Sequence, residues 1–155
     1  MSLEDNSFAG ILWEPTGTVN YTEENNVGIY GFVISLNTND AYLDIEVGHK
    51  VSIEYTDETR EVLVVDAAPK SYDNTIANHR VVDIYQRRVL IYPNFDNLIH
   101  KEIKRIVLQR TNGKVWTINT KPKRAKKLLS ELAKAMDEAK ESYKTKVAND
   151  NYFDE

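Results

Sequence analysis

The pattern of apolar and polar residues through the middle of the chain is typical of β-strands. Residues 27–36 are rich in β-branched and aromatic side chains and end at the turn-forming residues 37–40. Residues 41–47 and 50–55 alternate between apolar and polar positions, and a short polar turn joins the second run to residues 61–65. We therefore expect strands over 27–36 and 41–47, followed by a hairpin of 50–55 with 61–65.

The next part of the chain begins with a polar segment. Residues 67–79 have the composition of a loop, and β-rich runs follow over 80–85 and 88–92. Pro93 closes the second run, because proline cannot donate to a strand ladder. We expect a loop and then two strands here.

The strongest local signal for a hairpin is the pair Asn112-Gly113, which readily adopts a type I′ turn. It lies between the strand-like residues 103–110 and 114–119. A two-residue loop would place Gln109 opposite Trp116. The sequence therefore predicts a hairpin with that register.

The hydrophobic period changes after residue 119. Apolar residues then recur at spacings of three and four, which defines one stripe on a helix: Ala125, Leu128, Leu129, Leu132, Met136, Ala139 and Tyr143. Pro122 suits the first turn, where its missing N–H has no partner to lose. We expect an amphipathic helix from Pro122 to about Lys146 that covers an apolar face of the preceding sheet.

Together these elements predict an α+β fold. The expected architecture is an antiparallel β-barrel, or a strongly bent sheet, of about seven strands capped by one long C-terminal amphipathic helix. The 155 residues fit a single domain with an ordinary core, which we place at 8–147. Residues 1–7 are expected to be frayed, and the acidic residues 148–155 are expected to form a disordered tail.

The order of these elements resembles the pleckstrin-homology-like superfold. The likeness is closest over residues 103–140, where a strand that begins Glu102-Ile103-Lys104-Arg105-Ile106, the Asn112-Gly113 turn, the strand Val115-Trp116-Thr117-Ile118 and the helix follow in turn. The resemblance implies a barrel closed at one end by the helix. That family contains binders of phosphoinositide headgroups, peptides and proteins, so the fold does not decide the function. This chain is acidic where that family carries its basic headgroup-binding loop.

Charge divides the chain into two unlike halves. The net charge of −4 combines −11 over residues 1–66 with +7 over residues 67–155. Such asymmetry indicates a charged partner, or two halves that neutralise each other within one domain. The isoelectric point near 5.5 lies far below the value above about 9 that is usual for a nucleic-acid-binding domain. Nucleic acid is therefore a disfavoured partner.

The densest basic cluster lies at the start of the predicted helix. It comprises Lys121, Lys123, Arg124, Lys126 and Lys127. Cations are disfavoured there because the N-terminus of a helix carries about half a positive charge. Basic side chains beside free backbone N–H groups would bind an anion, so we predict that Lys121, Lys123, Arg124 and Lys127 bind a phosphate, a headgroup or an acidic segment of a partner. The alternative is that acidic residues from the first half lie over the helix start and neutralise it.

The sequence carries no recognisable catalytic motif. It has no cysteine, which excludes thiol catalysis, disulfides and cysteine zinc sites. Its three histidines, His49, His79 and His100, lack the spacing of metal ligands, so we expect no metal and no cofactor. No secretion signal or transmembrane segment is recognisable, which favours a cytoplasmic location.

These observations favour a non-catalytic interaction or adaptor module whose partner is another protein or a second copy of the chain. One alternative is a self-assembling structural subunit of a virus-like or phage-like particle, in which opposite charges meet between copies. The other is an enzyme whose active site leaves no local signature, since catalytic groups are recognised by geometry rather than by sequence order.

Overall fold

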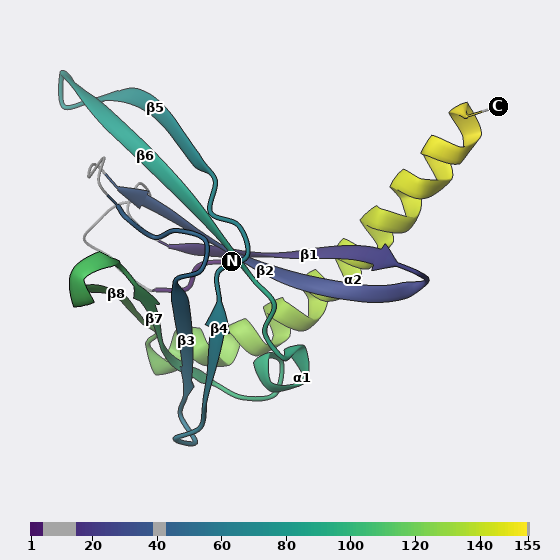
Figure 1. The fold of residues 1–155 in the computed structure, drawn as a ribbon, viewed down its shortest axis with the longest axis horizontal. Coiled ribbons are helices and arrows are strands. Elements are labelled where there is room, and N and C mark those ends of the chain that lie inside the picture. The colour runs from purple at the N-terminus through teal and green to yellow at the C-terminus, as the bar shows by residue number, and fades with distance from the viewer. Residues whose placement is uncertain (5–14, 39–42, 155) are drawn as a thin grey trace.

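The computed structural model describes residues 1–4, 15–38 and 43–154 of the chain. Within these residues, eight antiparallel strands form two four-stranded sheets, and a long C-terminal helix follows them (Figure 1), which confirms an α+β fold. The first sheet has the spatial order β1 (Thr16–Glu24), β2 (Val27–Thr38), β6 (Arg80–Ile91) and β5 (Lys70–Ala77). The second has the order β4 (Arg60–Val64), β3 (Lys50–Tyr55), β7 (Ile103–Gln109) and β8 (Val115–Asn119). The described strands do not join into one closed barrel.

The hydrophobic core lies between the inner faces of the two sheets. Alternate residues of β2 and β3 point into it and are at most 1% exposed: Phe32, Ile34, Leu36, Val51, Ile53 and Tyr55. Every second residue in these parts of the two strands is buried, which matches the alternation of apolar and polar residues in the sequence. The short helix α1 (Phe95–Leu98) covers part of this core with Phe95 and Leu98. The strand predictions over 27–36, 50–55 and 61–65 are therefore confirmed.

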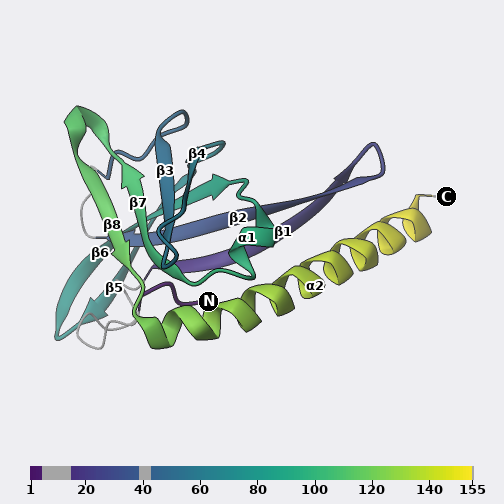
Figure 2. The same cartoon turned by 90° about the horizontal axis from the view of Figure 1, so that it is seen from below.

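The long helix α2 (Pro122–Phe153) packs against β1 and β7 and then continues past the sheets (Figure 2). Leu128 and Leu132 are fully buried in the core, in the stripe that the sequence predicts. Farther along, Tyr143 packs edge-on against Tyr21 of β1, with ring centroids 5.4 Å apart. The predicted helix and its apolar face are confirmed, and the helix is longer than expected.

Residues 43–47 do not form the predicted strand, although Leu43 and Ile45 are buried. Hydrogen bonds from the side chains of Arg87 and Arg110 hold this segment in place of strand pairing. The remaining residues of that prediction, 41 and 42, lie outside the described residues.

The prediction of a loop over 67–79 is wrong, because residues 70–77 form strand β5. Most of β5 is exposed on both of its faces, so its sequence lacks the apolar alternation that marks a half-buried strand. Its partner β6 is one strand of 12 residues rather than two short ones.

The hairpin of β7 and β8 forms, but its register differs from the prediction by one residue. Gln109 pairs with Val115 rather than with Trp116. Asn112 and Gly113 adopt positive φ angles of 58° and 73°, as such a pair favours. The loop includes Thr111 as well, because the backbone N–H and hydroxyl of Thr111 both donate to Asp44.

Residues near both ends of the described chain take part in defined structure, and residues 5–7 of the segment expected to be frayed lie outside the described residues. Leu3 is fully buried, and its backbone N–H donates to the carbonyl of Pro15 at 2.9 Å. At the other end, α2 runs to Phe153 through most of the segment expected to be a tail. No glycine or proline interrupts residues 123–153, so nothing in the sequence stops the helix near Lys146. The resemblance to the pleckstrin-homology-like superfold stays a prediction.

Candidate functional site

The basic cluster at the start of α2 is divided by the structure. Lys121 precedes the helix, and Lys123 and Lys127 are exposed one helical turn apart. Arg124 instead turns inward: its Nε donates to the carbonyl oxygen of Ser2 at 2.8 Å, and its guanidinium pairs with Glu131. Three of the four predicted binding residues are therefore available to a ligand, and the fourth ties the helix to the N-terminal segment.

The lysines of this cluster have no ion-pair partner within the described chain. The acidic partner of Arg124 comes from α2 itself, not from the first half. Neutralisation of the helix start by first-half carboxylates is thus not observed in residues 1–4, 15–38 and 43–154. Asp5 and Glu14 lie outside these residues.

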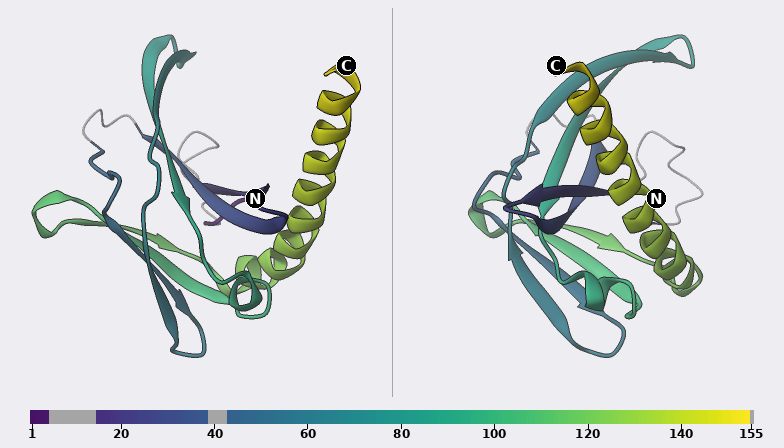
Figure 3. Two further views of the ribbon diagram at one scale, coloured as in Figure 1. Left: turned by 45° about the vertical axis from the view of Figure 1, so that its right-hand side comes forward. Right: turned by 90° about the vertical axis from the view of Figure 1, so that its right-hand side faces the viewer.

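A second surface is the outer part of the β5–β6 hairpin, residues 73–84, which we name the arm. In the described chain, β2 pairs with β6 only as far as Thr38 and Tyr85. Beyond that point the arm is a ribbon of two strands that projects from the body (Figures 1 and 3). An isolated two-stranded ribbon is marginally stable in water, because neither face packs on a core.

The arm carries an apolar pair at its tip. Ile76 and Val81 are direct cross-strand neighbours and are 77% and 69% exposed. At its base the rings of Tyr72 and Tyr85 lie 5.1 Å apart, and the Tyr72 hydroxyl donates to Asp83 at 2.6 Å. That hydrogen bond to a carboxylate raises the pKa of Tyr72.

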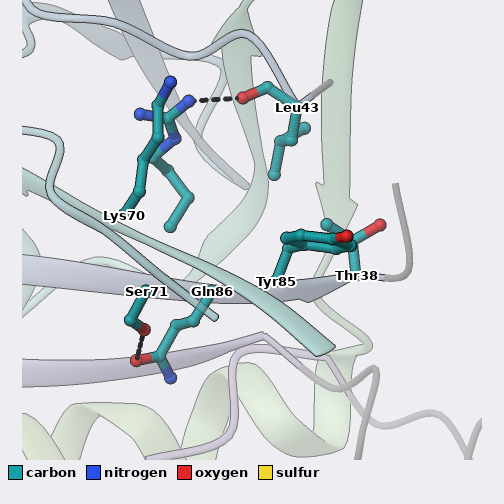
Figure 4. Close-up of a pocket in the computed structure, with 7 residues that line it drawn as sticks. Thr38, Leu43, Lys70, Ser71, Tyr85 and Gln86 are labelled. Carbon is teal, nitrogen blue, oxygen red and sulfur yellow. Dashed lines mark hydrogen bonds between the residues drawn. The ribbon is translucent and has the colours of Figure 1, made fainter. Parts of the chain in front are cut away.

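A cleft lies at the base of the arm, where residues 43–46 approach β5, β6 and the β7–β8 loop. It consists of two adjoining cavities, of about 400 and 40 Å³, which share Leu43, Lys70 and Arg87 in their walls. Leu43 and Tyr85 give the smaller cavity apolar surfaces (Figure 4). Four basic and two acidic side chains line the larger cavity: Lys70, Arg87, Arg110, Lys114, Asp44 and Glu46. The described lining of the cleft is therefore partly apolar, and it has two more basic than acidic side chains.

Arg87 builds one wall of the cleft. Its side chain is 5% exposed, and its guanidinium donates to the carbonyl oxygens of Leu43 at 2.7 Å and Ala68 at 3.0 Å. It also pairs with the Glu46 carboxylate at 3.3 Å. A buried charge requires such partners, and here they hold the irregular residues 43–46 against β6.

Asp44 holds the opposite wall. Its carboxylate accepts from Arg110 Nε at 2.6 Å and from the Thr111 backbone N–H at 2.9 Å. The hydrogen bond from Arg110 is the main reason that the pKa of Asp44 lies below its usual value. Arg87 and Arg110 pair with Glu46 and Asp44, and the Glu46 carboxylate also lies 3.8 Å from Lys70 Nζ. Lys70 and Lys114 are both exposed, and Lys114 has no ion-pair partner among the described residues.

Sequence reasoning did not identify the cleft or the tip of the arm. Lys70 and Ile76 lie in the segment taken for a loop, and Val81 lies in an apolar run that resembles an ordinary strand. The positive charge of residues 67–155 was the one signal that pointed toward Arg87, Arg110 and Lys114.

Two further properties concern the described residues. They contain no group of three or more histidine, aspartate or glutamate side chains placed to hold a metal ion. No helix among them combines the length and the apolar character needed to cross a bilayer.

Comparison of the chain with protein-family models, with curated proteins and with solved structures found no match. The surfaces described above are therefore the basis on which we argue function.

Proposed function

We propose that the protein is a non-catalytic interaction module that associates with further copies of itself, as a subunit of a larger assembly. The observation that carries this proposal is the arm, a two-stranded ribbon with an exposed apolar tip. A ribbon of this kind gains stability when a partner covers it, because the described chain leaves most of its residues exposed.

The chemistry of the arm suits a protein partner. Burial of a side chain such as Ile76 or Val81 contributes about 1.5–3 kcal/mol. The outer edge of β5 also has no neighbouring strand in the described chain, so its backbone groups can pair with an added strand. Between Ser71 and Ala77 this edge carries one charged residue, Asp73, and no proline, so it lacks most of the features that prevent edge-to-edge pairing.

Sedimentation equilibrium over a range of protein concentrations tests the proposal. We expect concentration-dependent association of the wild-type chain, and a weaker association of Ile76→Lys with Val81→Lys. The matched control is Val62→Lys with Val115→Lys, which alters exposed valines on the outer face of the second sheet. A wild-type chain that stays monomeric at every concentration would refute self-association.

The exposed lysines at the start of α2 are a second candidate surface, for an anionic group rather than for a copy of the chain. Lys121, Lys123 and Lys127 have no ion-pair partner in the described residues, which supports this reading.

A further inference from the structure

The far end of α2, residues 147–154, is an exposed segment with two aromatic and two acidic residues. Beyond Tyr143 the helix leaves the sheets, and every described residue from Lys144 on is exposed. Tyr152 and Phe153 are 76% and 80% exposed, and their rings pack edge-on with centroids 5.0 Å apart. Exposed aromatic side chains of this kind often anchor protein interfaces.

The charge of this segment opposes the usual preference of a helix end. The C-terminal end of a helix carries about half a negative charge, which favours cations in the last turn. The last turn of α2 contains no basic residue, and Asp150 and Asp154 add two negative charges. The end of α2 is therefore negative and aromatic, and within the described chain no cation forms an ion pair with either carboxylate.

The cleft at the base of the arm has the complementary character. Its described lining has two more basic than acidic side chains, with exposed Lys114 and Lys70 at its rim, and the Lys70 contact with Glu46, 3.8 Å long, is itself exposed. Leu43 and Tyr85 offer apolar surface beside these charges. A helix is about 10–12 Å across with its side chains, so a cavity of about 400 Å³ admits aromatic side chains rather than the helix itself.

One copy cannot place its own helix end in its own cleft. The end of α2 lies at one end of the long axis of the molecule, and the arm and the β7–β8 loop lie toward the other end (Figures 1 and 2). Leu128, Leu132 and Tyr143 hold the helix against the body, so it cannot fold back. A helix end that fills the cleft must come from another copy.

We propose that Tyr152 and Phe153 of one copy insert into the cleft of the next, where Asp150 and Asp154 pair with Lys70 and Lys114. This inference rests on the proposed self-association and names a contact for it. If two copies make this contact reciprocally, they close a two-fold dimer, whereas a contact made in one direction only gives a ring or an open filament.

The absence of cysteine from the chain permits a direct test by site-specific cross-linking. Chains with Ser71→Cys, at the cleft, are mixed with chains with Asn151→Cys, at the helix end, under mild oxidation. Both positions are exposed, so neither change disturbs the core. The control mixture replaces the cleft position with Thr117→Cys, which is exposed on the outer face of the second sheet. We expect the mixed disulfide to form at least tenfold faster in the first mixture.

Two sets of substitutions show whether the named side chains cause this preference. Tyr152→Ser with Phe153→Ser, added to the helix-end chain, should weaken the contact at least about tenfold, since truncation of buried aromatic anchors has effects of this size. Lys70→Glu with Lys114→Glu, added to the cleft chain, should also slow cross-linking. Equal rates in the two mixtures, or rates that neither set changes, would overturn the inference.

A charge reversal at the other basic surface separates the two candidate receptors. Lys123→Glu with Lys127→Glu should leave the cross-linking rate unchanged. If these substitutions slow cross-linking, the helix end binds at the start of α2, and the assignment to the cleft is overturned. If the wild-type chain associates and the two mixtures react equally, this inference fails and the proposed function stands. If the wild-type chain is monomeric in sedimentation, the proposed function fails.

Discussion

Leu132→Ala tests whether α2 is part of the hydrophobic core, and we expect a large loss of stability. Leu132 is fully buried on the face of the helix that packs into the core. Truncation of a buried leucine removes apolar contacts and leaves a cavity, which together lower the free energy of unfolding by about 2–5 kcal/mol. In a domain of this size each 1 kcal/mol lowers the melting temperature by about 2–4 °C, so the expected decrease is roughly 4–20 °C.

Thermal melting followed by circular dichroism measures this effect. The matched control is Lys134→Ala on the solvent side of the same helix. The Lys134 side chain is 78% exposed and forms an exposed ion pair with Glu138, so its removal should change the free energy of unfolding by less than about 0.5 kcal/mol. If Leu132→Ala melts at the same temperature as this control, α2 does not close the core and the reasoning is refuted.

Two further predictions concern charged residues. The pKa of Asp44 is lowered in the folded state, so its ion pair with Arg110 stabilises the fold above the ordinary carboxyl pKa of about 4, and this contribution is lost as the pH falls through the lowered value. Urea unfolding should therefore show a smaller acid-induced loss of stability for Asp44→Asn than for the wild type, and an equal loss would contradict this account. Lys123→Glu with Lys127→Glu should leave the free energy of unfolding unchanged or raise it by up to about 1 kcal/mol, mainly through Lys123 in the first turn, while it weakens binding of inorganic phosphate measured by calorimetry. A clearly lower melting temperature would mean that the structure itself requires these lysines.

Elements with one buried face were predictable from local pattern. The spacing of Leu128, Leu132 and Met136 predicted α2, and the alternation of Val51 and Ile53 predicted β3. In each case burial of one face against the core imposes a period on the sequence, and that period can be read without knowledge of the partner. The end of the helix was not predicted, because residues 144–153 are exposed in the described chain and their sequence therefore has no apolar periodicity.

The cleft and the arm could not be predicted in the same way. Strand β5 leaves most of both faces exposed, so its sequence has the composition of a loop. The guanidinium of Arg87 meets the carbonyl of Leu43 across 44 residues of sequence, and Asp44 meets Thr111 across 67. No local pattern encodes such contacts, because each depends on how two distant segments pack.

The sequence by itself determined the class of fold, the apolar stripe of α2 and the basic character of the second half of the chain. Only the tertiary structure decided where the charged side chains lie and which partners they have. It turned Arg124 inward to Ser2 and Glu131, and it left Lys70 and Lys114 at the rim of a cleft. The physical reason is that periodicity records whether a residue is buried, whereas the partner of a charged side chain is set by the spatial arrangement of elements that are distant in sequence.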